Sequence, residues 1–164
     1  MIGFNLFKAS PFVLEKMNCL CRLLWQSKRK YEKAAENIPD KELRCTILTL
    51  AQGKNQYACE LSSQIHTLGG IPPHENIDDA EQKEELTILR DEKEVLAFCK
   101  VSESGVVNAY REILDEASLY EGLRKMIHYQ LNGALCAFMQ LKLLSSLKFH
   151  LPIFEHNYLA DAKV

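Results

Sequence analysis

Hydrophobic residues recur every three or four positions along most of the chain, which is the spacing of one buried face of an α-helix. The pattern predicts four long helices. The first opens at Ser10-Pro11, with Ser10 as its N-terminal cap, and stops before Pro39. Its spacing of alternating fours and threes is typical of a bundle helix. Its predicted buried positions are Val13, Met17, Leu20, Leu24, Ser27, Tyr31, Ala34 and Ile38.

The second predicted helix begins after Asp40, which can cap it, and ends at the double glycine Gly69-Gly70. Pro72-Pro73 follows and prevents the helix from continuing. Only a few residues separate the first two helices, so they must be antiparallel neighbours. The predicted buried face of the second helix is Leu43, Ile47, Leu50, Lys54, Tyr57, Leu61, Ile65 and Leu68.

Two further helices are predicted in the second half of the chain. The third begins within residues 80–86 and runs to about Leu114, and a break at 115–119 precedes a fourth that ends near Lys148. The remaining residues, 149–164, are expected to fold back on the bundle. The predicted face of the third helix is Ile88, Val95, Cys99, Ser102, Val106, Ala109 and Ile113, and that of the fourth is Leu123, Ile127, Gln130, Ala134, Ala137, Leu141 and Leu144.

The segment from Gly69 to about Glu84 is long for a turn between helices. Extended, some 15 residues reach about 50 Å, whereas a second helix of about 27 residues is about 40 Å long. The segment can therefore return along the whole bundle and make the second and third helices parallel. We predict an all-α four-helix bundle in which a long crossover joins two hairpins. It forms a single domain over 1–164, with its core at about 11–148.

Composition narrows the classes of function. The formal charge is −2 and 26% of residues are charged, a balance that argues against a dedicated nucleic-acid binder. No run of about 20 apolar residues exists, so no membrane span is expected, and the N-terminus has no signal-peptide pattern. The six cysteines include no C-x-x-C pair. We expect reduced, mostly buried thiols in a cytoplasmic protein, with a redox or metal role as the alternative.

The two halves of the chain resemble each other. Both carry the string L-R-x-x-I-x-x-x-x-x-G-x-x-x-x-x-x-x-L, which starts at Leu43 and at Leu123. Gly53 and Gly133 occupy the same position in this repeat, and a glycine within a helix costs about 1 kcal/mol relative to alanine. We therefore expect another group to pack closely against both glycines. Tyr31 and Tyr110 are a further matched pair.

Four stretches carry a likeness to a known superfamily: Tyr31-Glu-Lys-Ala-Ala-Glu36, Asp40-Lys-Glu-Leu43, Glu60-Leu61 with Leu68-Gly-Gly-Ile-Pro72, and Ala109-Tyr-Arg-Glu-Ile-Leu114. With these motifs the chain resembles the ferritin-like superfamily over about residues 20–145, and more narrowly a bacterial ferritin-like family of unknown function. The resemblance implies a fold of two duplicated hairpins with a crossover. It implies no activity, because that narrower family has none assigned.

Enzymes of the superfamily bind two metal ions with a Glu on the first and third helices and Glu-x-x-His on the second and fourth. The resemblance places these six ligand positions at Leu24, Lys54, Tyr57, Glu103, Ala134 and Ala137. Only Glu103 keeps a carboxylate. Because Lys54 puts a cation where a metal ligand would stand, we expect no dimetal site, and no ferroxidase, oxygenase or iron-storage activity.

A buried ammonium needs a partner or loses its proton. We therefore predict a Lys54–Glu103 ion pair within a polar cluster at the vestigial metal site. The cluster would draw its hydrogen bonds from Tyr31, Tyr57, Ser27, Ser102 or Gln130. The alternative is that Lys54 extends outward between the helices to reach water.

The sequence favours a metal-free, non-enzymatic module for interaction or structure, with no cofactor and no catalytic residue. We expect a homodimer, an unidentified protein partner, and no binding to nucleic acid or membrane. One alternative is a dimetal protein that binds iron or manganese through unusual ligands, namely Glu32, Glu60, Glu103 and His128. Another is a small apolar ligand bound in the core beside Gly53 and Gly133.

The basic run 28–30 and the acidic segment 75–94 are interpreted as solvated faces or as surfaces that dock subunits.

Overall fold

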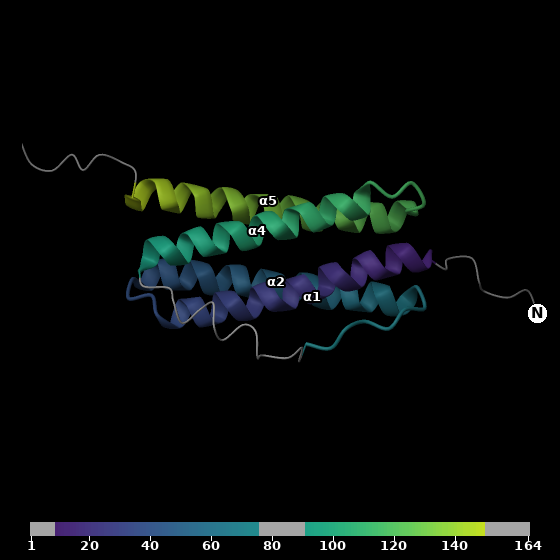
Figure 1. Cartoon of the computed structure of the whole chain (residues 1–164), viewed down its shortest axis with the longest axis horizontal. Helices are drawn as coiled ribbons and strands as arrows, with labels where there is room; N and C mark the ends of the chain where they lie inside the picture. Colours follow the sequence, from purple (N-terminus) through teal and green to yellow (C-terminus); the bar gives the residue numbers. More distant parts are fainter. Residues whose placement is uncertain (1–8, 76–90, 150–164) are drawn as a thin grey trace, which may run out of the picture.

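Four long helices lie side by side in the computed structural model, which describes residues 9–75 and 91–149 (Figure 1). They are α1 (Pro11–Glu36), α2 (Lys41–Thr67), α4 (Glu92–Leu114) and α5 (Glu121–Phe149). No strand occurs within these described ranges, so the prediction of an all-α four-helix bundle is confirmed. None of the described helices has the length and apolar character needed to cross a bilayer.

The helix ends follow from local capping. The Ser10 side chain accepts a hydrogen bond from Val13 N at 3.2 Å, and Asp40 Oδ1 accepts one from Glu42 N at 2.9 Å, so both predicted caps are present. Gly69 ends α2 with a φ of +81°, a left-handed conformation that glycine adopts without strain.

The predicted start of the third helix within residues 80–86 is wrong. The α4 helix starts at Glu92, because Asp91 has an extended backbone (φ −147°, ψ 171°) and its side chain caps Glu94 N at 2.9 Å. The apolar spacing of the preceding residues resembles that of the helix, and the periodicity alone did not reveal the cap. Ile88, assigned to this helix face from the sequence, and the tail 150–164 lie outside the described residues.

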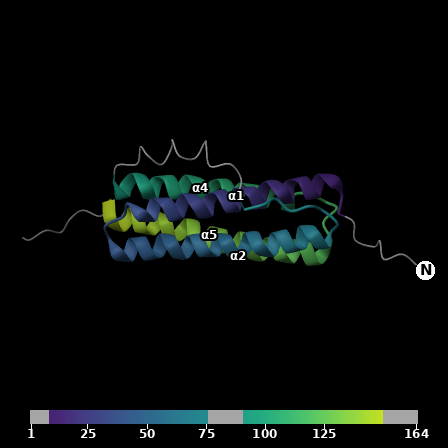
Figure 2. The same cartoon turned by 90° about the horizontal axis from the view of Figure 1, so that it is seen from below.

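The helices form two layers, with α1 beside α4 in one and α2 beside α5 in the other (Figure 2). Lys148, at the end of α5, binds both Asp40 before α2 and Glu92 at the start of α4. At the opposite end, Gln64 near the end of α2 bonds Tyr120, which follows α4. The α2 and α4 helices therefore run in the same direction. Most of the chain that joins them lies outside the described residues, so the crossover itself stays a prediction.

The core agrees with the predicted helix faces in most positions. Every predicted face residue of α1 is buried, from Val13 to Ile38. The exceptions are half-buried side chains near the edges of the faces, namely Leu50, Tyr57, Ser102, Ala109 and Leu144. The expectation of mostly buried thiols is wrong: only Cys21 and Cys99 are buried, and Cys19, Cys45, Cys59 and Cys136 are exposed. These four lie on outward helix faces.

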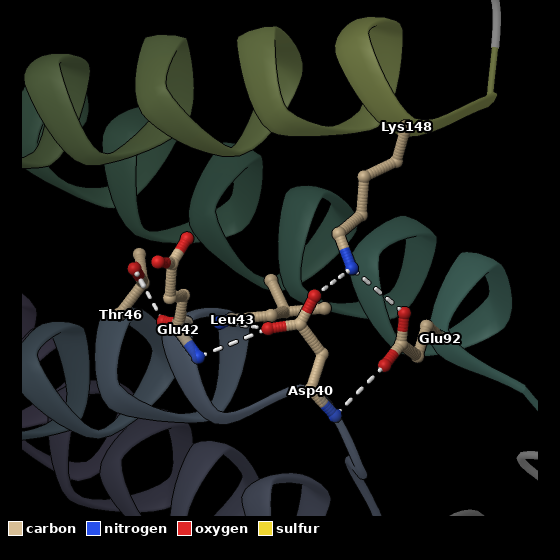
Figure 3. Close-up of polar contacts among 6 residues, drawn as sticks. All are labelled: Asp40, Glu42, Leu43, Thr46, Glu92 and Lys148. Atoms are coloured by element: carbon tan, nitrogen blue, oxygen red, sulfur yellow. Dashed lines mark hydrogen bonds and ion pairs between the residues drawn. The ribbon is translucent and has the colours of Figure 1, made fainter.

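Lys148 joins three helices in a surface cluster of charges (Figure 3). Its Nζ lies 2.5 Å from Asp40 Oδ2 and 2.9 Å from Glu92 Oε2, while Glu92 Oε1 accepts a bond from Asp40 N at 3.3 Å. The Lys148 bond lowers the pKa of the Asp40 carboxyl, and the Asp40 bond raises the pKa of the Lys148 ammonium. We term these three residues the charge clasp.

Removal of the charge clasp by Lys148→Met is expected to lower the melting temperature at neutral pH and low salt. Because the Asp40 pKa is lowered, its contribution is present above its ordinary value of 3.8 and is lost as pH falls through the lowered value. Because the Lys148 pKa is raised, its contribution is present below 10.5 and is lost as pH rises beyond the raised value.

Thermal melts of the Lys148→Met variant and the wild type across pH and salt check this prediction. High salt should shrink the difference, because it screens exposed charges. Lys125→Met is the matched control: Lys125 pairs with Glu121 at 3.4 Å, but both side chains are more than 70% exposed, so little change is expected. An equal loss in both variants would contradict a specific role for the clasp.

Candidate functional site

One charged pair lies in the interior of the bundle, formed by Lys54 of α2 and Glu103 of α4. Lys54 is 2% exposed and Glu103 is 0% exposed. Lys54 Nζ donates a hydrogen bond to Glu103 Oε1. The ammonium therefore remains inside the bundle on the carboxylate, and does not extend to solvent as the alternative required.

Tyr31 of α1 completes the pair. Its hydroxyl lies 2.8 Å from Glu103 Oε2 and 3.0 Å from the Cys99 carbonyl oxygen, so the two acceptors share one phenolic proton. Both oxygens of Glu103 thus have partners, one cationic and one neutral. Ser27 and Ser102 bond each other at 3.0 Å between the same two helices as Tyr31 and Glu103.

Burial sets the protonation of these groups. Loss of hydration lowers the pKa of Lys54, and the attraction and hydrogen bond of Glu103 oppose this change. Burial, followed by the charge of Glu103, raises the pKa of Tyr31 and brings that of Cys99 to about 12. The phenol and the thiol beside the pair therefore keep their protons at neutral pH, and neither is an activated nucleophile.

A second polar group lies on the side of the core nearer α5. Gln130 is 0% exposed. Its Oε1 accepts a bond from the Tyr110 hydroxyl at 3.0 Å, and its Nε2 donates to Glu60 Oε2 at 2.9 Å and to the Tyr57 carbonyl at 3.3 Å. Glu60 also accepts a bond from Gln56 at 2.9 Å. This network stabilises the contact of α2, α4 and α5 without a formal cation.

The structure brings together only part of the cluster expected from the sequence. Lys54, Glu103 and Tyr31 meet, whereas Gln130 belongs to the second network. The Tyr57 side chain instead points to α5, where its ring lies 6.0 Å from that of Tyr129 at an interplanar angle of 76°. Among the hydrogen bonds of the described residues, none joins the Tyr57 or Gln130 side chain to the Lys54–Glu103 pair.

Sequence reasoning missed the Tyr110–Gln130–Glu60 connection. One signal was present, since Tyr110 is the repeat counterpart of Tyr31 and both side chains are buried hydroxyls that need an acceptor. Tyr31 finds its acceptor on α4 and Tyr110 finds one on α5. The repeat identified a second buried hydroxyl without indicating its partner.

The two repeat glycines differ in their surroundings. A Cβ at Gly133 would overlap the Tyr57 hydroxyl and lie 2.8 Å from its Cζ, so the tyrosine packs directly on the α5 backbone. A Cβ at Gly53 would meet no atom within 4 Å. The expectation of close packing is right at Gly133 and wrong at Gly53. The alternative prediction of a small apolar ligand beside these glycines is also wrong at Gly133, because the Tyr57 side chain fills that space.

The alternative metal ligands do not converge. Glu32 pairs with Lys28 at 3.5 Å, Glu60 binds two glutamines, Glu103 binds Lys54, and His128 is exposed. Within residues 9–75 and 91–149, no three His, Cys, Asp or Glu side chains are placed to hold a metal ion. The structure therefore does not gather Glu32, Glu60, Glu103 and His128 into one group of ligands.

The basic run and the start of the acidic segment contact each other within one chain. Lys28 Nζ donates to Glu75 Oε1 at 2.8 Å, which raises the pKa of Lys28, and Lys30 Nζ lies 5.4 Å from the centre of the Phe98 ring. The Lys28–Glu75 contact holds the segment after α2 against α1. Both lysines of the basic run therefore make contacts within the chain.

Comparison with known proteins adds no assignment. No protein-family model matches the chain, and a search of curated proteins finds no relative.

Proposed function

We propose that the chain is a metal-free member of the ferritin-like superfamily that acts as a non-enzymatic module for interaction or structure. The observation that carries this proposal is the Lys54–Glu103 pair. It lies between α2 and α4 at the two positions that the resemblance assigns to metal-binding carboxylates.

The chemistry of this pair opposes a metal ion. The Lys54 ammonium occupies one oxygen of Glu103 and Tyr31 occupies the other, so a divalent cation would have to displace both. A cation beside a buried ammonium is also repelled strongly, because the interior screens charge poorly. The counterpart positions Leu24, Ala134 and Ala137 are buried apolar residues that offer no ligand.

The same proposal includes the crossover connection between α2 and α4 and the cellular setting of the protein. The parallel direction of α2 and α4 supports a crossover connection of the ferritin type. A cytoplasmic setting is consistent with six cysteines that form no disulfide, and a bacterial source is implied by the resemblance alone.

Elemental analysis of protein purified without chelator tests the metal-free assignment. We expect far less than one equivalent of iron, manganese or zinc per chain. The variant Lys54→Glu replaces the ammonium with a second carboxylate beside Glu103, so added Mn²⁺ should raise its melting temperature and leave that of the wild type unchanged.

Gln52→Glu is the control for this variant, because it adds the same charge at an exposed position of the same helix. It should show no Mn²⁺-dependent stabilisation. Two tightly bound metal ions per wild-type chain would overturn the proposal.

A further inference from the structure

A cavity of about 120 Å³ lies between α4 and α5, which pack side by side (Figure 1). The residues that line it are Ser104, Val107, Asn108, Arg111, Leu135 and Phe138. A water molecule takes about 30 Å³ of liquid, so the cavity has the volume of about four waters. This is enough room for one large apolar side chain.

Exposed apolar side chains flank the cavity on both helices. Val101 is 75% exposed and precedes Ser104 and Asn108 by three and seven residues, so it lies on the same side of α4. Met139 is 59% exposed and follows Leu135 by four residues on α5. We term the cavity and these two flanking side chains the α4–α5 groove. Because contact of apolar surface with water is unfavourable, the groove is stabilised by a group that covers it.

Three basic side chains lie along the α4–α5 groove. Arg111 lines the cavity, Lys142 follows Met139 by three residues, and Lys100 Nζ bonds a hydroxyl of α5 at 3.4 Å. No acidic residue lines the cavity, and α5 contains no Asp or Glu after Glu121. Within the described part of the chain, neither Arg111 nor Lys142 forms an ion pair. The groove therefore suits an occupant that is both apolar and acidic.

The sequence that follows α5 has this composition. Residues 150–161 contain two acidic residues, Glu155 and Asp161, and no Lys or Arg, so their charge is opposite to that of the groove. Their large apolar residues are Leu151, Ile153, Phe154, Tyr158 and Leu159.

We propose that residues 150–161 dock in the α4–α5 groove of the same chain and cover its apolar surface. The segment is joined directly to α5, which forms one wall of the groove. A short connection gives an effective concentration in the millimolar range, so modest apolar and ionic contacts are sufficient for docking. A second copy of the chain or a free acidic ligand would have to compete with this advantage. The proposal is independent of whether the core holds a metal ion.

The length of the segment fits the groove. Leu135 precedes Phe149, the last residue of α5, by 14 residues of helix, which is about 21 Å. The chain must reverse direction after Phe149, and Pro152 disfavours a continued helix there. If the reversal takes about four residues, the other eight reach about 26 Å when extended. Apolar residues near position 159 can then cover the cavity, with Asp161 beside Arg111.

Limited digestion of the full chain with chymotrypsin, followed by mass spectrometry, tests the proposal. Chymotrypsin cleaves after large apolar residues such as Phe154 and Tyr158. We expect cleavage at these two sites to be at least about tenfold slower in the wild type than in a free peptide of residues 150–164, because docking removes the segment from the protease. Met139→Asp should restore most of the rate, since it places a carboxylate in the groove against an acidic segment.

The contact between Arg111 and Asp161 has its own test in the same assay. Arg111→Glu should accelerate cleavage by about three- to tenfold, and Asp161→Arg in that background should return the rate toward that of the wild type. Lys125→Glu is the matched control, because it makes the same change of charge at a 75% exposed side chain of α5 outside the groove. It should leave the rate unchanged.

Wild-type cleavage as fast as that of the free peptide would overturn the proposal, whether a second copy or an acidic lipid then covers the groove. Equal acceleration by Arg111→Glu and Lys125→Glu would also overturn it, because the effect would then reflect net charge. Protection that increases with protein concentration would overturn docking within one chain, since the segment would then bind another copy. Met139 and Arg111 are exposed, and circular dichroism will show that the helices persist in their variants.

Discussion

Glu103→Leu is expected to destabilise the bundle by about 3–5 kcal/mol, the largest loss that we expect from a single substitution in this protein. Lys54 is 2% exposed, and Glu103 is the carboxylate on which its ammonium lies. Removal of that carboxylate leaves a positive charge in the interior without its counter-charge. Urea denaturation followed by circular dichroism measures the change in the free energy of unfolding.

The double variant Lys54→Met/Glu103→Leu separates the unpaired charge from lost packing. It removes both charges and keeps the interior filled with apolar groups of similar size. The Tyr31 hydroxyl retains the Cys99 carbonyl as its acceptor. We expect the double variant to be more stable than Glu103→Leu alone, since paired buried charges can be replaced together at little cost. If the double variant is less stable than Glu103→Leu, the stability loss of Glu103→Leu does not come from an unpaired Lys54 ammonium.

The loss in Glu103→Leu should also depend on pH. Burial lowers the pKa of Lys54, and only Glu103 opposes this change, so the variant should lower the pKa further. A lysine with a lowered pKa in the folded state penalises folding fully below that value. The penalty shrinks as pH rises toward the ordinary value of 10.5, where the unfolded chain also loses the proton. A penalty that is the same at neutral pH and at high pH would indicate lost packing instead.

Gly133→Ala and Gly53→Ala form the second test, and they should change the free energy of unfolding in opposite directions. Both replace a glycine within a helix, a change that adds about 1 kcal/mol of helix propensity. At Gly53 a methyl group meets no atom within 4 Å, so we expect that gain in full. At Gly133 the methyl group overlaps the Tyr57 ring, and the enforced shift should turn the gain into a net loss of about 1–3 kcal/mol.

Tyr57→Phe provides the internal control for this pair. The phenyl ring lacks the hydroxyl that the new methyl group would overlap, so Gly133→Ala should cost less in the Tyr57→Phe background than in the wild type. Gly53→Ala should have the same effect in both backgrounds. A stabilising Gly133→Ala would mean that the Tyr57 ring moves aside freely and does not set the spacing of α2 and α5.

The fold was predictable because the local signals agree with one another. The apolar spacing of α1, the cap at Ser10 and the stop before Pro39 all point to one helix, and the structure has it at Pro11–Glu36. The start of α4 was not predictable from the same spacing. Asp91 itself has an extended backbone and caps the helix, and an aspartate in an acidic stretch does not stand out as a cap.

The contacts of the interior were predictable where a charged residue occupies a buried helix position. A lysine in the buried face of α2 requires a counter-charge, and Glu103 is the buried carboxylate that supplies it. The Tyr57 position was not predictable in this way. A tyrosine on a helix face can point into the core or along its edge, and the absence of a side chain at Gly133, on another helix, decides the matter.

The direction of the first and last helices has a practical consequence for engineering. Lys148 at the end of α5 binds Asp40, which lies just beyond the end of α1. The start of α1 and the end of α5 therefore lie at opposite ends of the described bundle. The α1 helix has 26 residues, which corresponds to about 39 Å. A circular permutant that joins residue 149 to residue 9 therefore needs a bridging peptide of at least about 12 extended residues. Labels attached at these two positions would report the length of the molecule.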